Sequence, residues 1–213
     1  MLATNKISRG DMSGSLNRQR FVDAALDVIA DVGVDKLSMR RVASQLGVSA
    51  MAMYKHFANK DELLGAAFEE FIARAEVLPD DQLPWDEWLI VSARGMYQAL
   101  CSEMSWVPWL GKLRLGGNAL RVTERFAAKL AESGLATDAS VRVYMATIQL
   151  VVGAVCMRAS LHAGHWQQGE AAAAMPEALS PEIFTGLANA VAQEPIDISL
   201  PLLIEGVRHQ LLA

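Results

Sequence analysis

The residues best suited to chemistry lie in one short segment, and the chemistry that they suit is phosphate binding. Tyr54, Lys55 and His56 follow one another, and Lys60 lies close behind them. Hydroxyl and ammonium groups are common donors to phosphate oxygens in protein–DNA complexes, and the imidazole adds another donor. Lys60 also falls in the first turn of a predicted helix, whose N-terminus itself favours an anion. The segment therefore predicts contacts with the phosphate backbone of a nucleic acid.

Two short predicted helices place these donors. Ser38 is a capping residue in front of the first helix, Gly47 ends that helix where a left-handed backbone is needed, and Ser49 caps the second. Two helices joined by a short turn that contains glycine have the arrangement of a helix-turn-helix. Ala50 and Ala52 keep the outer face of the second helix small, so its backbone could approach base edges closely. The pattern predicts a helix that reads DNA.

The rest of the chain also has the spacing of helices. Apolar residues recur at intervals of three and four, and no stretch shows the alternation of a half-buried strand. The expected fold is all-α: a head of three helices, residues 17–64, is joined by a fourth helix to a larger helical domain, residues 65–213. Besides the two short helices, the predicted helices cover residues 18–32, about 60–78, 85–101, 105–113, 118–133, 138–162, 181–192 and 200–211.

The charge is distributed unevenly along the chain, whose formal net charge is −5. Residues 1–60 carry nine Lys and Arg against five Asp, whereas residues 61–213 carry ten basic and nineteen acidic residues. A basic head on an acidic body indicates that the head is the part that meets a polyanion. Ordinary variation of surface charge is the alternative explanation.

Composition and motifs exclude several classes of protein. Two cysteines, Cys101 and Cys156, are too few for a disulfide framework or a four-cysteine zinc site. The longest apolar-rich run without a charge, residues 143–157, is shorter than the roughly 20 residues of a membrane helix. The N-terminus lacks the apolar core of a signal peptide, so we expect a cytoplasmic protein with no membrane partner. Because G-x-S-x-G, P-loop and G-x-G-x-x-G motifs are missing, we expect neither an enzyme nor a cofactor.

Residues 18–65 resemble the tetracycline-repressor (TetR) family of bacterial transcription regulators, and the all-helical remainder agrees with that resemblance. The resemblance rests on an ordered series of residues: Ser38, Arg41, Ala43, Leu46, Gly47, Val48, Ser49, Tyr54, His56, Phe57, Asn59, Lys60 and Leu63. It implies a homodimeric repressor that binds a palindromic operator in double-stranded DNA and is released by a small-molecule effector. A small-molecule-binding or protein-interaction module without specific DNA binding is the alternative.

The resemblance also implies which residues meet DNA. It makes residues 50–54 the recognition helix and places Arg40 where it can bind guanine with two hydrogen bonds. Met39, Met51 and Met53 depart from the polar or branched residues that are frequent at these positions, so few hydrogen-bonding side chains remain to read bases. The predicted DNA-binding residues are Ser38, Arg40, Ser49, Ala50, Met51, Ala52, Tyr54, Lys55, His56 and Lys60.

Four of the five tryptophans fall between residues 85 and 109, which is dense for a single stretch. Any one of them could be a plain core residue, but such a cluster in the body of a sensor also predicts a pocket for a largely apolar or aromatic ligand. The predicted ligand-binding residues are Trp85, Trp88, Met96, Tyr97, Met104, Trp106, Trp109, Gln149 and Trp166. Whether the ligand releases or promotes DNA binding stays open.

Two apolar helices near the C-terminus are candidates for pairing between protomers, because in the family the corresponding helices form a four-helix bundle with their symmetry mates. The predicted interface residues are Val152, Val155, Leu200, Ile204, Val207 and Leu211. His162 and His165 are one turn apart and could bind a metal, but no further ligand lies near them, so we assign no metal site. The fourth helix is the expected route between DNA and ligand, with a hinge at Pro79 and Pro84.

Overall fold

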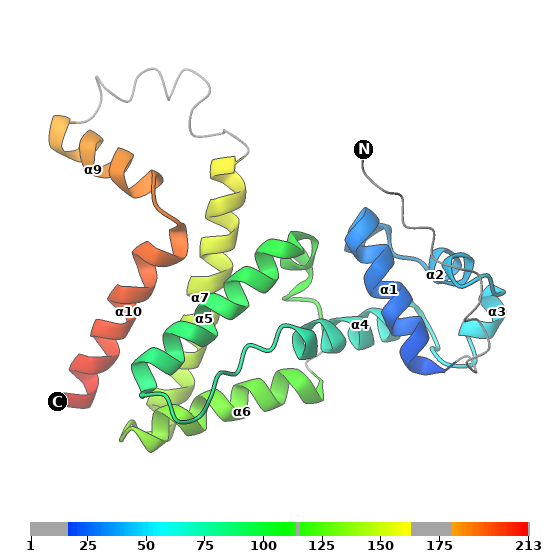
Figure 1. The fold of residues 1–213 in the computed structure, drawn as a ribbon, viewed down its shortest axis with the longest axis horizontal. Coiled ribbons are helices and arrows are strands. Elements are labelled where there is room, and N and C mark those ends of the chain that lie inside the picture. Colours follow the sequence, from blue (N-terminus) through cyan, green and yellow to red (C-terminus); the bar gives the residue numbers. More distant parts are fainter. Residues whose placement is uncertain (1–16, 114–115, 163–179, 213) are drawn as a thin grey trace, which may run out of the picture. The chain divides into compact units, whose positions relative to one another are not determined.

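The computed structural model describes residues 17–113, 116–162 and 180–212, and every regular element within them is helical (Figure 1). The chain divides into two compact units, Met1–Ala67 and Phe68–Ala213. The first unit contains α1 (Arg18–Val32), the short 3-10 helix η1 (Val34–Lys36), α2 (Met39–Gln45), α3 (Ala50–Met53) and the start of α4 (Lys60–Arg74). The second contains the end of α4, α5 (Trp85–Ser102), the 3-10 helix η2 (Met104–Trp109), α6 (Gly117–Glu132), α7 (Thr137–His162), α9 (Pro181–Val191) and α10 (Pro195–Leu212).

The helix ends in the first unit follow local sequence signals. The Ser38 hydroxyl accepts a hydrogen bond from the Arg41 backbone N–H at 3.2 Å and so caps α2. Asn59 caps α4 in the same way, because its side chain accepts from the Glu62 N–H at 2.9 Å. Gly47 has a φ of 67° at the end of α2, a conformation that costs glycine little. The signals predicted at Ser38 and Gly47 are confirmed, whereas Ser49 precedes α3 without forming a side-chain capping bond in the structure.

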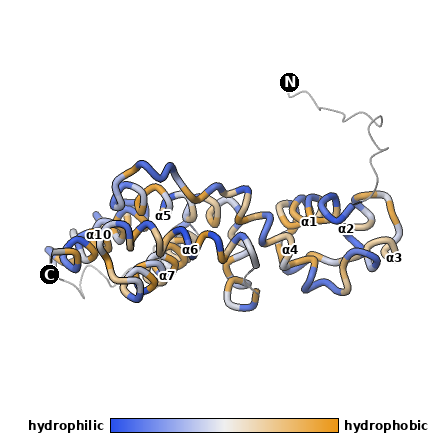
Figure 2. The backbone as a smooth tube through the Cα atoms, turned by 90° about the horizontal axis from the view of Figure 1, so that it is seen from below, coloured by the Kyte–Doolittle hydropathy of each residue, from blue (hydrophilic) through white to orange (hydrophobic). Residues whose placement is uncertain are grey.

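Each unit has a core made by the apolar faces of its helices. Hydrophobic positions recur along the helices between hydrophilic ones, as Figure 2 shows. In the first unit Phe21, Val42, Met53 and Phe57 are buried. In the second unit α7 packs against α5, α6 and α10, and Trp88, Trp106 and Phe126 are fully buried.

Three elements differ from the sequence-based expectation. Helix α4 ends at Arg74 instead of about residue 78, and Glu76 follows with a φ of 45°. The expected helix 105–113 is the 3-10 helix η2, which spans Met104–Trp109 and contains Pro108. Helix α10 begins at Pro195 instead of residue 200, because proline at the first helical position already has a helical φ, and Pro201 lies inside the helix.

Residues within and just before the predicted hinge, residues 79–84, form hydrogen bonds with α5 and α6. The Ser92 hydroxyl donates to the Val77 carbonyl at 2.7 Å, and Val77 itself is buried. Further along, Asp81 is bound by two basic side chains of α6. The connection between α4 and α5 is therefore held at two points in this structure, and the hinge at Pro79 and Pro84 stays a prediction.

Helix α7 is the one described helix whose length and apolar composition would allow it to cross a membrane. Only 33% of its most apolar window is buried. It packs against α5, α6 and α10, and core helices of soluble proteins meet the same criteria of length and composition.

Candidate nucleic-acid interface and effector region

A tight turn joins α2 and α3 and fixes the direction of the second helix. The Val48 N–H donates to the Ala43 carbonyl at 3.0 Å, and the Gly47 N–H donates to the Ser44 carbonyl at 3.1 Å. These bonds use carbonyl groups that the end of α2 leaves without helical partners. The chain then enters α3 at Ala50, with Ser49 as the preceding residue in extended conformation.

The methionines of this region have different roles. Met53 is fully buried and Met39 is 7% exposed, so both belong to the core of the first unit. Met51 is 73% exposed on α3. Of the three methionines that depart from the family pattern, only Met51 is therefore available to contact a base.

The other predicted DNA-binding residues fall into two groups. Tyr54, Lys55, Arg40 and Ser49 are exposed, and Ala50 and Ala52 are half-buried beside them in the sequence. The second group already has partners within the protein: the Ser38 hydroxyl caps α2, the Lys60 ammonium lies 3.5 Å from the Asp35 carbonyl, and the His56 ring centroid lies 5.1 Å from that of Phe21. Within the part of the chain that the structure describes, the exposed group is the one that is open to DNA.

Arg18 contacts the segment that joins α3 to α4, a role that the sequence analysis did not predict. Its guanidinium lies 4.1 Å from the centre of the Phe57 ring, and its Nη1 atom donates to the His56 carbonyl and lies 3.0 Å from a Glu62 carboxylate oxygen. Glu62 in turn accepts a hydrogen bond from the Ala58 N–H at 2.7 Å. That bond, followed by the Arg18 guanidinium, holds the pKa of Glu62 below its usual value.

The tryptophans of the second unit pack in two separate clusters. The Trp88 ring lies edge-on to Phe126 of α6, with centroids 4.8 Å apart. The Trp106 ring packs against Phe68 and Phe71 of α4 at 5.2 and 5.6 Å. Both indoles are fully buried, and within the described residues neither indole N–H has a hydrogen-bond partner.

The remaining predicted ligand-binding residues are spread over several environments. Met96 and Tyr97 are buried in α5, and Trp85, Met104 and Trp109 are half-buried. Gln149 is exposed on α7, and Trp166 lies outside the described residues, as does His165. The structure therefore does not gather this set around a single cavity in the part of the chain that it describes.

A cavity of about 280 Å³ lies instead where the end of α7 meets the α9–α10 connection. Its wall contains Arg158, Leu161 and His162 from α7 and Glu194 before α10. Arg158 lies 3.0 Å from Glu194, and the Tyr97 hydroxyl donates to the same carboxylate oxygen at 2.7 Å. Burial and then the bond to Glu194 raise the pKa of Tyr97 above its usual value, so the phenol stays protonated and remains a donor.

Four of the six predicted interface residues lie in the core of the protomer. Val155, Leu200, Ile204 and Val207 are at most 3% exposed, so their side chains already pack within the chain itself. Val152 and Leu211 are half-buried. Among the residues whose burial is described, the large apolar side chains that these two helices leave exposed are Val141, Met145 and Met157 of α7 and Ile198 and Leu202 of α10.

Two family models match the chain. Residues 21–67 match the model of bacterial regulatory proteins of the tetR family, and residues 78–211 match the model of the tetracyclin repressor-like C-terminal domain.

Relatives and solved structures of the same kind match over much of the chain. The class A tetracycline repressor of Escherichia coli is 32% identical over 142 residues, which are 66% of this chain and 66%, or just under two thirds, of that protein. A possible TetR family transcriptional regulator from Streptomyces coelicolor has a TM-score of 0.70 at 26% identity and covers 91% of this chain and 99% of its own. A TetR variant from Acinetobacter baumannii in complex with minocycline has a TM-score of 0.67 at 25% identity, with coverages of 92% and 98%.

Proposed function

This chain belongs to the tetR family of bacterial regulatory proteins, and on that premise we propose that it is a cytoplasmic, homodimeric transcriptional repressor whose binding to DNA is controlled by a small molecule. One observation carries the DNA-binding part of the proposal. Helix α3 follows a tight glycine turn and buries Met53, while Met51 in the helix and Tyr54 directly after it are exposed by 73% and 52%. A short helix that is anchored on one side and exposed on the other is suited to enter a major groove.

The exposed side chains divide into base-directed and phosphate-directed groups. Arg40 can bind the O6 and N7 atoms of guanine with two hydrogen bonds, and Met51 can contact a thymine methyl group. Tyr54, Lys55 and Ser49 carry donors for phosphate oxygens, which position the protein without reading sequence. Specificity in this protein would thus depend on few side chains.

Selection of a DNA site by the wild-type protein from a random-sequence library tests the proposal directly. We expect recovery of a palindrome whose half-sites are about one helical turn apart, because a two-fold dimer presents two recognition helices at about 34–36 Å. Recovery of no preferred sequence would contradict the repressor and would favour a module that binds only a small molecule or another protein.

For the dimer we propose an interface that uses the exposed apolar side chains of α7 and α10. Val141 and Met145 lie one turn apart on α7, and Ile198 and Leu202 lie one turn apart on α10. Helices α7 and α10 pack against each other within the protomer, so the two apolar stripes belong to neighbouring elements. Covering both stripes with a second copy would bury large apolar side chains that one chain leaves in water.

For the effector we propose the cavity beside Arg158 and Glu194. Its volume of about 280 Å³ is near the lower end of small-molecule sites, so it suits a compact ligand. The guanidinium and the carboxylate could bind polar groups of the ligand, while Leu161 and Val191 contact its apolar part. The buried Trp88 and Trp106 then serve the core of the second unit, and the effector is more polar than the tryptophan content of the sequence suggests.

Helix α4 is the covalent route by which such a ligand would act on DNA binding. It is one continuous helix that begins at Lys60 in the first unit and ends at Arg74 in the second. A ligand shifts the protein between two states only by binding one of them more tightly. We therefore propose that the effector favours a state of the second unit in which the end of α4 is held differently.

A further inference from the structure

The end of α4 is attached to the beginning of α6 by Glu69, a side chain of α4. The Glu69 carboxylate accepts hydrogen bonds from the backbone N–H groups of Gly116, at 2.9 Å, and Asn118, at 2.5 Å. The Asn118 side chain returns the contact, because its amide donates to the Glu69 carbonyl at 3.0 Å. A carboxylate is favoured at this position, since the first N–H groups of a helix have no helical partners and carry partial positive charge.

Gly116 has no side chain where Glu69 makes this contact. A Cβ atom built on Gly116 would lie 2.5 Å from the carboxylate carbon of Glu69. The φ of −106° at Gly116 is open to any residue, so glycine is not needed for the backbone conformation. It is needed for the approach of Glu69.

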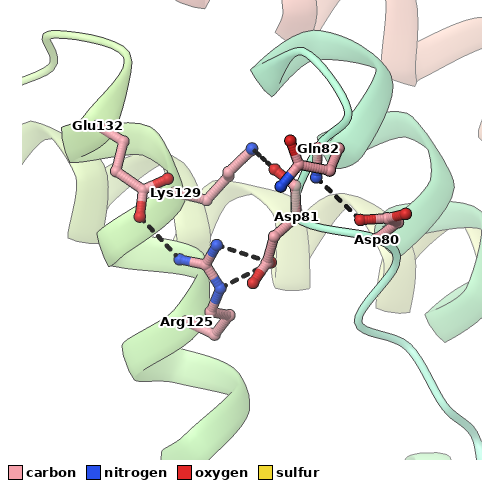
Figure 3. Close-up of polar contacts among 6 residues, drawn as sticks. All are labelled: Asp80, Asp81, Gln82, Arg125, Lys129 and Glu132. Carbon is pink, nitrogen blue, oxygen red and sulfur yellow. Dashed lines mark hydrogen bonds and ion pairs between the residues drawn. The ribbon is translucent and has the colours of Figure 1, made fainter.

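The connection that follows α4 is also attached to α6, closer to the C-terminal end of α6 (Figure 3). The Arg125 guanidinium reaches one oxygen of Asp81 through Nε, at 2.8 Å, and Nη2, at 2.6 Å, and it also contacts Glu132 at 3.0 Å. The Lys129 ammonium donates to the Asp81 backbone carbonyl at 2.5 Å, although Lys129 is only 8% exposed. Burying an amino group without a hydrogen-bond acceptor is costly, so this contact with the Asp81 carbonyl stabilises the position of Lys129.

We infer that α6 is the element that positions the end of α4. It does so through two sets of contacts, which we call clasps. The first is made by Glu69 with Gly116 and Asn118, and the second by Asp81 with Arg125 and Lys129. The two clasps lie on either side of Arg74, where α4 ends. Glu69 and Asp81 are thus positioning residues for the repressor proposed above, on which this inference rests in part. Opening a clasp frees the end of α4 without touching α2 or α3.

The sharpest variant is Gly116→Ala, because one added methyl group displaces Glu69 while every charge stays. The matched control is Gly117→Ala, since a Cβ at this neighbouring glycine meets nothing within 4 Å. Hydrogen exchange measures the clasp without DNA, and it should become faster in residues 68–74 of Gly116→Ala and stay unchanged in Gly117→Ala. Equal exchange in both variants would show that Glu69 does not hold α4 and would overturn the inference.

Binding to the selected DNA site measures the consequence for function. Gly116→Ala and Glu69→Gln should each weaken binding about 5-fold or more, the lower end of typical couplings between sites, and Gly117→Ala should bind as wild type does. Lys129→Met should act in the same way through the second clasp. Its control is Arg142→Met, which removes the same charge from an exposed ion pair with Asp138 on α7.

Unchanged DNA affinity in all three clasp variants, with faster exchange in α4, would overturn the positioning role. A wild-type protein that selects no DNA site would instead contradict the proposed function, and the exchange measurement would still decide whether the clasps hold α4.

Discussion

The Arg18 guanidinium lies 3.0 Å from the Glu62 carboxylate, which ties the first residue of α1 to the first turn of α4. Both side chains are partly exposed, at 49% and 41%. The pair therefore contributes through its geometry, together with the Ala58 hydrogen bond to Glu62 and the Phe57 ring under Arg18, more than through a strong charge interaction. It fixes the segment that joins α3 to α4, where the proposed phosphate contacts lie.

Removing the Glu62 charge should lower the stability of the first unit in a pH-dependent way. Because the pKa of Glu62 is lower in the folded protein than in the unfolded chain, its contribution is complete above the unfolded pKa of about 4.3 and is lost as the pH falls through the folded pKa. Glu62→Gln should therefore unfold at lower urea than wild type at pH 7, and the difference should narrow below about pH 4. Asp61→Asn, in the same turn of α4, is the control, and an equal effect of both variants would remove the special role of Glu62.

Lys60 is expected to contact phosphate from the first turn of α4. Replacing it by Ala should weaken binding about equally on all DNA sequences, because phosphates carry no sequence information. The plot of log affinity against log salt should become less steep by about two units, one for each subunit of a dimer. Fluorescence anisotropy at several salt concentrations measures the slope, with Lys112→Ala in the second unit as control. An unchanged slope would remove Lys60 from the phosphate contacts and leave it with its contacts inside the protein, which include the Asp35 carbonyl.

Arg40 is expected to read a base. Arg40→Ala should relax preference at one base pair in each half-site, at about 1–3 kcal/mol per contact. The control is Arg41→Ala. Arg41 lines a shallow depression together with Val28 and Asp31 of α1, so its removal should not change the preference for a base. Affinities for a set of single-base operator variants show the effect. If Arg40→Ala discriminates among them as wild type does, Arg40 is not a reader.

A charge on the exposed stripe of α10 should separate the protomers. Leu202 is 73% exposed, so Leu202→Glu should leave the protomer folded, whereas a charge at the buried Val207 would unfold it. The variant should sediment as a monomer and lose specific DNA binding. Leu120→Glu on α6, where the leucine is 56% exposed, should remain a dimer. A dimeric Leu202→Glu protein would place the interface elsewhere.

The effector and DNA should oppose each other by equal factors. A coupling of about 1–3 kcal/mol is typical, and linkage requires that DNA weaken ligand binding as much as ligand weakens DNA binding. A small compound that raises the melting temperature of this protein is titrated with and without the selected DNA, and the two affinities are compared. Arg158→Ala should abolish the response if the cavity beside Glu194 is the site. A compound that binds equally well in both titrations is not an effector of DNA binding.

Local features of the first unit were predictable from sequence because they depend on neighbours a few residues away. Ser38 and Asn59 cap their helices through the N–H groups three residues ahead, and Gly47 adopts a φ that its own lack of a side chain permits. The all-helical fold follows from the same short-range periodicity. These relationships do not depend on how the rest of the chain folds.

The sequence alone could not predict which apolar residues are buried or which distant residues form pairs. An apolar face looks the same whether the protomer or a second copy covers it, so periodicity could not separate the buried Val155 and Ile204 from the exposed Met145 and Leu202. Nothing near Arg18 or Asp81 in the sequence indicates Glu62 or Arg125 as a partner, because such pairs form only when packing brings distant segments within about 3 Å. The sequence by itself thus determined the helices and the helix-turn-helix, whose hydrogen bonds are local, whereas only the tertiary structure decided which faces are core, where the cavity lies and which side chains fasten α4 to α6.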